Sequence, residues 1–147
     1  RQMCIRDSSD SDNSESIFLN QMPEKSGITF SDEFVKKWEL IYSTRETVNK
    51  ALEEKRNEKV IGKSLEANII IHSGGEMFEK YSQLSDQLAE ILIVSGVSVI
   101  NDKDGETEFE VVRATGEKCE RCWVYSETVG KDSEHPTLCS RCASVVK

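Results

Sequence analysis

Two pairs of cysteines near the end of the chain have the spacing of metal ligands. Cys119 and Cys122 form one CxxC motif, Cys139 and Cys142 form another, and sixteen residues separate the two motifs. Each motif lets two sulfurs face one point, and the intervening loop can bring the second motif opposite the first. The sequence therefore predicts one tetrahedral zinc ion. With four thiolates bound it has no open position for water or substrate, so its role is structural.

Other uses of these cysteines remain open from the residues alone. Disulfides belong to oxidising compartments, but residues 1–20 contain no apolar run of the kind found in a signal peptide. A thioredoxin-like redox site uses one CxxC in a βαβ setting rather than two matched pairs. His135 lies in the intervening loop and could replace one cysteine as a ligand.

Cationic and aromatic side chains flank the predicted zinc ligands. Lys118 and Arg121 surround the first motif, Trp123 follows it directly, and Arg141 lies inside the second. This combination suits a single-stranded nucleic acid, because cations bind phosphates and a ring stacks on an unpaired base. In the alternative interpretation the arginines are solvated surface residues and Trp123 covers the small zinc core.

The sequence contains no catalytic constellation. It has no glycine-rich phosphate loop, no HExxH motif and no Ser/His/Asp arrangement with a defensible spacing. His72 lies at the end of a predicted strand, where we expect a structural role. If the chain belongs to an enzyme, the chemistry is expected elsewhere.

The charge is unevenly distributed. The net charge of the 147 residues is −8, and residues 64–113 carry ten acidic and three basic side chains. Residues 31–63 and 114–147 are close to neutral. The overall charge argues against a nucleic-acid binder, but either neutral segment could present a basic face. No apolar run of about 18 residues is present, so no membrane-spanning helix is predicted.

Residues 31–61 predict one long helix. Ser31 is a suitable N-cap, and Gly62 is expected to end the helix. Apolar residues recur at spacings of three, four and seven and form a single stripe, so the helix should pack in a bundle; they are Phe34, Trp38, Ile41, Val48 and Leu52. Arg45 occupies the stripe where leucine is expected, and we interpret it as a side chain that extends past the contact to solvent.

Residues 64–113 predict a small α+β unit. A strand is expected at 68–71, and Ser73 with Glu76 form a capping box for a following helix. Periodicity predicts that the apolar face of that helix consists of Met77, Tyr81, Leu84 and Leu88. Two further strands are expected at 97–100 and 109–113, joined by an exposed acidic turn at 102–106. The run 91–94 could extend the helix or begin a strand.

Two blocks of the chain resemble the C-terminal region of bacterial-type isoleucyl-tRNA synthetases. One is WELIYSTRETVNKALE at 38–53, with IGKSLEA at 61–67. The other is GEKCERCW at 116–123, with LCSRC at 138–142. The stretch SIFLNQMP at 16–23 also resembles the segment that precedes the long helix, so the resemblance covers about residues 16–147.

The resemblance implies a function for the whole family. Its members join isoleucine to its tRNA with ATP, using a Rossmann-type catalytic domain and an inserted editing domain. Both would precede residue 1, so we expect this chain to be inactive alone and to work with those domains in the cytoplasm. The expected partner is the anticodon region of the isoleucine tRNA.

The resemblance also implies a domain organisation of α+β class. Residues 16–63 would end a helical anticodon-binding domain, 64–113 would form a small α+β junction, and 114–147 would form a four-cysteine zinc ribbon. The cysteines at 119, 122, 139 and 142 would bind zinc, and Trp123 with Lys118 and Arg121 would contact the anticodon. The partners of the long helix's stripe would then lie mostly in upstream helices.

Two features depart from the family pattern. Val124 follows Trp123 where relatives often have histidine, so a contact made by that histidine cannot be transferred. Residues 1–8 match nothing in the family, and the chain begins with arginine. We therefore expect a fragment in which residues 1–15 are a disordered or artefactual tail.

Two other functions remain possible on sequence grounds. A similar finger ends the formamidopyrimidine-DNA glycosylases, where it binds DNA, but there it follows a helix–two-turns–helix region. The acidic middle segment also permits a zinc-ribbon interaction module that binds no nucleic acid.

Overall fold

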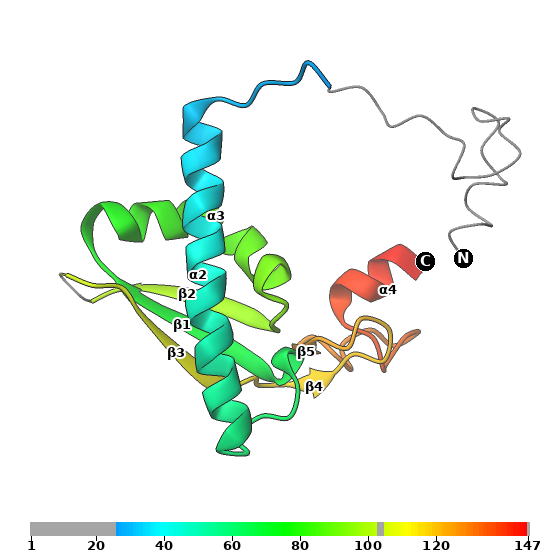
Figure 1. The fold of residues 1–147 in the computed structure, drawn as a ribbon. Coiled ribbons are helices and arrows are strands. Elements are labelled where there is room, and N and C mark those ends of the chain that lie inside the picture. Colours follow the sequence, from blue (N-terminus) through cyan, green and yellow to red (C-terminus); the bar gives the residue numbers. More distant parts are fainter. Residues whose placement is uncertain (1–25, 103–104, 147) are drawn as a thin grey trace, which may run out of the picture. The chain divides into compact units, whose positions relative to one another are not determined.

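The computed structural model describes residues 26–102 and 105–146 (Figure 1). The predictions for the tail at 1–15 and for the stretch at 16–23 lie outside this range. The chain divides into two units, residues 1–34 and 35–147. Helices and strands are mixed along the described chain, as the α+β prediction requires. None of the described helices is long and apolar enough to cross a bilayer.

The first unit includes the start of helix α2 (Asp32–Asn57). The amide of Phe34 donates a hydrogen bond to Oγ of Ser31 over 3.2 Å, so Ser31 is the N-cap, as predicted. The rings of Phe30 and Phe34 stack with their centroids 5.0 Å apart.

Helix α2 ends earlier than the sequence predicts. The amide of Val60 donates to the carbonyl of Lys55 and the amide of Lys59 to that of Arg56, each over 3.0 Å, while Lys59 has a φ of 61°. This is the Schellman pattern, with lysine rather than glycine in the left-handed position. The prediction that Gly62 ends the helix is therefore wrong, because backbone hydrogen bonds close the last turn before the chain reaches it.

A three-stranded sheet forms the centre of the second unit. Its strands are β1 (Ala67–Ser73), β2 (Gly96–Asn101) and β3 (Glu108–Arg113), in the order β2–β1–β3. Strand β2 runs parallel to β1 and β3 runs antiparallel to it. The strands predicted at 68–71, 97–100 and 109–113 are thus confirmed, and each is slightly longer than expected. The turn predicted at 102–106 includes residues outside the described range.

Helix α3 (Gly75–Leu92) connects β1 to β2. Its N-cap is Gly74 without a side-chain hydrogen bond, so the predicted capping box is wrong. The reason is that β1 continues through Ser73, which is buried, and Glu76 pairs with Lys80 instead. The run at 91–94 is divided, because α3 ends at Leu92 in a second Schellman turn with Ile93 at a φ of 58°.

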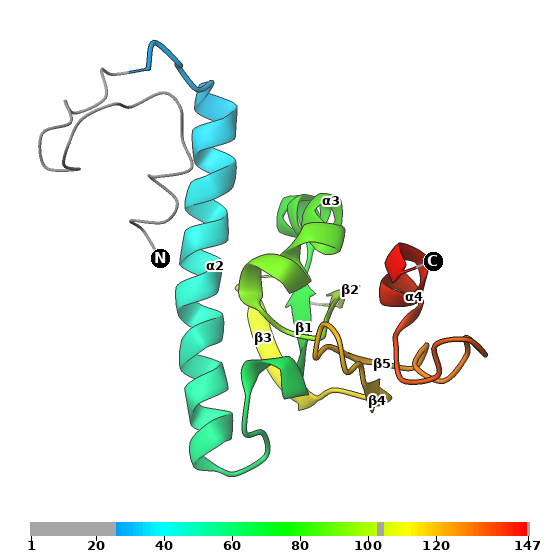
Figure 2. The same ribbon diagram turned by 90° about the vertical axis from the view of Figure 1, so that its right-hand side faces the viewer.

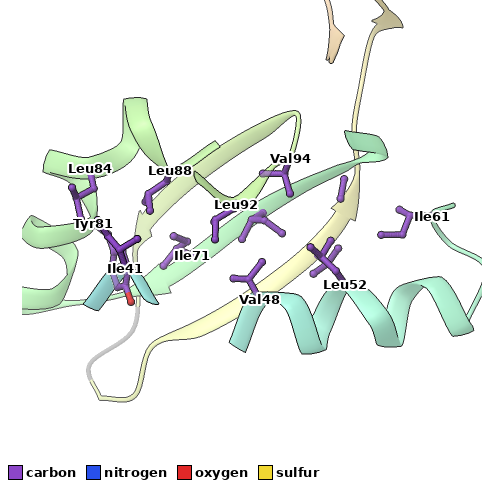
Figure 3. Packing of buried hydrophobic residues seen from close by; sticks show 13 residues of the cluster. Ile41, Val48, Leu52, Ile61, Ile71, Tyr81, Leu84, Leu88, Leu92 and Val94 are labelled. Carbon is purple, nitrogen blue, oxygen red and sulfur yellow. The ribbon is translucent and has the colours of Figure 1, made fainter. Parts of the chain in front are cut away.

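The main core lies between α2, α3 and the sheet (Figure 3). Figure 2 shows α2 running beside β3, with α3 over one face of the sheet. The predicted face of α3 is confirmed, since Tyr81, Leu84 and Leu88 are buried and Met77 packs beside them.

Helix α2 contributes its own buried residues to this core. Ile41, Val48 and Leu52 are at most 2% exposed. The prediction that Ile41 and Val48 find their partners mostly outside this chain is therefore wrong, because the sheet and α3 cover them. Nearer the start of the stripe, Phe34 is 43% exposed, and Trp38 is half-buried and packs against the edge of the core.

The C-terminal part contains a short hairpin and a helix. Strands β4 (Glu117–Lys118) and β5 (Tyr125–Ser126) pair antiparallel, and α4 (Ser140–Val146) follows. Gly116 has a φ of 85°, and a Cβ there would lie 2.4 Å from the carbonyl carbon of Ser126. Only glycine can therefore precede this hairpin without displacing its backbone.

Candidate metal centre and nucleic-acid interface

Four cysteine sulfurs gather at one point in the C-terminal part. The Sγ atoms of Cys119, Cys122, Cys139 and Cys142 all lie within 4.8 Å of one another. Those of Cys122 and Cys139 are 3.8 Å apart. Four thiolates at about 2.3 Å from zinc, arranged as a tetrahedron, are about 3.8 Å apart. The cluster therefore fits one zinc ion, whereas a disulfide would need about 2.0 Å between sulfurs.

Backbone hydrogen bonds hold the first CxxC turn in place. The amide of Cys119 donates to the carbonyl of Val124 over 3.0 Å, and the amide of Trp123 donates to the carbonyl of Cys119 over 2.8 Å. The amide of Cys139 donates to Sγ of Cys119 over 3.3 Å, which links the two motifs. The second motif enters α4, where the amide of Ala143 donates to the carbonyl of Cys139.

The site stabilises one thiolate but not several. Burial disfavours the thiolate of Cys119, yet amides of Cys122, Cys139 and Arg121 donate to it and lower its pKa to about 6. Burial raises the pKa of Cys122 and of Cys139. Neighbouring buried thiolates repel one another, and a bound divalent cation removes that penalty. The donor set is therefore suited to a zinc ion.

The cluster forms a core separate from the main one. Cys119, Cys139 and Cys142 are buried, and Val129 and Leu138 pack against them. His135 is not among the ligand candidates at this cluster, and its amide donates to Oδ1 of Asp132. So few apolar side chains stabilise a fold only weakly, which is typical of domains held by metal.

Trp123 lies on the outside of this centre. It is 53% exposed, and it does not belong to the group that packs on the sulfur cluster. Nζ of Lys118 lies 4.8 Å from the ring centroid, and Nζ of Lys63 lies 5.6 Å from it. The structure thus brings predicted Lys118 and Trp123 together and adds a lysine from the loop after α2.

The two predicted arginines have different surroundings. Arg121 is exposed on the first CxxC turn. Nη1 of Arg141 donates to Oε1 of Glu90 on α3 over 3.0 Å, and a hydrogen bond to the thiol of Cys122 raises the pKa of Arg141. Arg141 therefore links the zinc module to α3, and its charge is partly compensated there.

Sequence reasoning missed Lys63. This lysine is far from Trp123 in the chain, and neither periodicity nor motif spacing brings the two together. The available signal was that Lys63 follows Gly62 within the IGKSLEA block at 61–67, one of the blocks that carry the family resemblance.

Comparisons with known proteins agree with this architecture. A family described as a zinc finger found in FPG and IleRS matches residues 116–145. The isoleucine–tRNA ligase of Bacillus mycoides (strain KBAB4) is 46% identical over 142 residues, which is 90% of this chain and 15% of the relative. That of Bacillus cereus (strain B4264) is 44% identical over the same length, with the same shares.

The chain is homologous to the C-terminal part of isoleucine–tRNA ligases. The resemblance carried by the blocks at 38–67 and 116–142 is thereby confirmed. The chain spans about 15% of the length of the isoleucine–tRNA ligases that it matches.

Proposed function

We propose that this chain is the segment of an isoleucine–tRNA ligase that binds the anticodon side of the tRNA, in the cytoplasm. The observation that carries the proposal is an exposed indole, Trp123, with the ammonium groups of Lys118 and Lys63 beside its ring. An unpaired base can stack on such a ring while the lysines meet the neighbouring phosphates.

The backbone at Trp123 supports a role for its ring. Its φ is 68°, in the left-handed region. That conformation costs an ordinary residue roughly 1–2 kcal/mol, whereas glycine adopts it freely. A large, half-exposed aromatic side chain at such a position gains little from folding, so its presence fits a binding role.

One zinc ion on Cys119, Cys122, Cys139 and Cys142 would hold this ring in place. When bound, the metal supplies folding energy to the ribbon and takes part in no reaction. The hydrogen bond from the main-chain amide of Trp123 to the carbonyl of Cys119 fixes the backbone that carries the indole against a ligand residue. Arg121 would add a further cation on the same turn.

We assign the remaining parts by the same homology. Residues 16–63 end a helical anticodon-binding domain, 64–113 form a junction and 114–147 form the zinc ribbon. Aminoacylation and editing would then belong to the other domains of the ligase, and this chain alone would form no Ile-tRNA.

The test compares Trp123→Ala with Trp123→Phe in the zinc-loaded chain. Base stacking contributes roughly 1–3 kcal/mol, so the alanine variant should bind isoleucine tRNA about ten- to a hundredfold more weakly. Phenylalanine keeps a stacking surface and should retain most of the affinity. Zinc content is measured in both variants.

Loss of zinc from Trp123→Ala would instead make the ring a cover of the metal site. If Trp123→Ala keeps both its zinc and its affinity for tRNA, Trp123 does not contact the tRNA. Tighter binding of abasic duplex DNA than of tRNA would favour the glycosylase alternative, and binding of neither would favour an interaction module.

A further inference from the structure

A polar hollow of about 390 Å³ lies where the end of α2 turns back toward β1. Three cationic side chains and a single carboxylate line it, together with apolar and backbone groups; the lining residues are Arg56, Lys59, Val60, Ile61, Gly62, Glu66 and Arg113. The hollow is outside the zinc module, and nothing in the proposed function so far uses it.

The one carboxylate of the hollow is already engaged. The amide of Gly62 donates to Oε2 of Glu66 over 2.8 Å. Hydrogen bonds from the amides of Gly62 and Lys63 lower the pKa of Glu66, with a smaller contribution from the charge of Arg113. The loop therefore holds this negative charge close to its own backbone, and the cations leave the hollow with an excess of positive charge.

The cations differ in how firmly they are held. Arg56 forms an ion pair with Glu53 and donates from Nη2 to Oγ of Ser64 over 3.0 Å, so it is fixed at one wall. Lys59 and Arg113 are exposed. An anion entering the hollow would meet one preorganised guanidinium and two side chains that can move toward it.

Lys59 occupies a position that its backbone disfavours. At a φ of 61° in a Schellman turn, glycine is the usual residue. Ile93 has the same conformation at the same kind of helix end, in α3. Ile93 is outside the hollow, so it provides a matched position with equal backbone geometry and no charge.

Lys63 connects the hollow to the aromatic surface. It follows Gly62, which lines the hollow, and its Nζ lies 5.6 Å from the centroid of the Trp123 ring. One lysine therefore lies between a cationic hollow and a ring able to stack on a base. In a nucleic-acid strand, backbone phosphates likewise flank the sugar that carries each base.

We infer that the hollow lined by Arg56, Lys59 and Arg113 binds a backbone phosphate of the same RNA strand that stacks a base on Trp123, with Lys63 between the two sites. The inference rests on the proposed function and extends it from the zinc module to the loop after α2. The ligand class is the phosphodiester of an unpaired RNA segment.

The experiment measures binding of isoleucine-tRNA transcript to the zinc-loaded chain over a fourfold range of salt, for Lys59→Gly and Ile93→Gly. Both changes relieve the left-handed backbone, so neither should lower the unfolding midpoint. Only Lys59→Gly removes a phosphate contact. It should make the slope of log affinity against log salt shallower by about 0.7–0.9, roughly a threefold change in affinity over that range.

A second pair tests the connecting lysine. Lys63→Ala should reduce the slope by a similar amount, whereas Lys80→Ala, on α3 and paired with Glu76, should leave it unchanged. Arg113→Lys keeps the charge and should retain most of the slope that Arg113→Ala loses.

The outcomes separate the two proposals. Unchanged slopes in Lys59→Gly and Lys63→Ala, together with weak binding by Trp123→Ala, would overturn the phosphate site and leave the proposed function standing. Equal losses in Lys59→Gly and Ile93→Gly would also overturn it, since the effect would then come from the helix ends. Absence of tRNA binding by the unmodified chain would overturn the proposed function and this inference with it.

Discussion

Thr44 is a polar residue in the apolar stripe of α2. It is 2% exposed, and its Oγ1 lies 2.8 Å from the carbonyl oxygen of Leu40 and 2.8 Å from the hydroxyl of Tyr81. A buried hydroxyl is costly unless it is paired, and here each of the two side chains satisfies the other. The pair therefore fixes the rotation of α2 against α3 as well as contributing to the core.

We expect Thr44→Val to destabilise the chain by about 1–3 kcal/mol, because the hydroxyl of Tyr81 stays buried without its partner. The double variant with Tyr81→Phe should cost less than the two single variants together, since no polar atom of the pair is then left unpaired. Urea unfolding of the three variants measures this. Thr47→Val, at an exposed site on the same helix, is the control. Additive costs would mean that the two hydroxyls are not coupled.

Residues whose role depends on local spacing were predictable from the sequence. The two cysteines within each CxxC motif, and Lys118 and Trp123, lie within a few residues of one another, and the repetition of the motif indicated that the two pairs meet. The contacts of Thr44 and Lys63 were not predictable from the sequence, because their partners lie on other elements. Arg45 is exposed, as its interpretation as a solvent-reaching side chain requires, but the apolar stripe gave no sign that the neighbouring Thr44 faces the core.

Among the strands, His72 of β1 joins both neighbours. Its Nδ1 lies 2.8 Å from Oδ2 of Asp102, just after β2, and its Nε2 lies 3.4 Å from Oε2 of Glu110 on β3. The hydrogen bond to Asp102, helped by Glu110, outweighs partial burial and raises the pKa of His72 above its usual value. The protonated ring can donate to both carboxylates at once and so connects three strands.

Because the folded-state pKa of His72 is raised, its contribution to stability is fully present below the unfolded pKa of about 6.5. It is lost as pH rises through the folded pKa. We expect the difference in unfolding free energy between the wild-type chain and His72→Gln to shrink as pH rises from about 5.5 to 8. Glu54, Lys55 and Glu108 line the hollow beside His72 and are the same in both chains. A difference independent of pH would show that folding leaves the pKa of His72 unchanged.

Element types followed from periodicity, but element ends did not. The β-branched run of β1 and the apolar face of α3 are local signals, and both were read correctly. The ends of α2 and α3 depend on Schellman turns at Lys59 and Ile93, residues that carry none of the glycine signal on which such predictions rely. The prediction that upstream helices cover Ile41 and Val48 was also wrong, because an apolar stripe does not reveal whether a sheet or a helix covers it.

At the scale of the whole second unit, the sheet and the zinc module have separate cores, and hydrogen bonds connect the two parts. The amide of Tyr125 donates to Oγ of Ser95 over 2.8 Å, and Ser95 donates in turn to the carbonyl of Leu65. The amide of Ala114 donates to the carbonyl of Glu66 over 2.7 Å. Such contacts orient the module but contribute little net stability, since each replaces a hydrogen bond to water.

Removal of zinc should therefore unfold the C-terminal module and leave the remainder folded. The sheet retains its own buried cluster across α2, α3 and β1, whereas the described residues of the module form a small cluster around the cysteines, with Val129 and Leu138 packed against them. Zinc binding to small four-ligand domains contributes on the order of 10 kcal/mol, more than the few joining hydrogen bonds can replace.

Amide hydrogen exchange before and after treatment with a strong chelator measures the outcome. The amides of Cys119 and Tyr125 should lose protection, while those of Ile69 and Ile71 in the centre of β1 should keep it, and added zinc should restore the original pattern. Loss of protection in β1 together with the module would show that the unit folds as one cooperative body. Retained protection at Cys119 would mean that the cysteine cluster holds its shape without metal, and the structural role of zinc would then have to be abandoned.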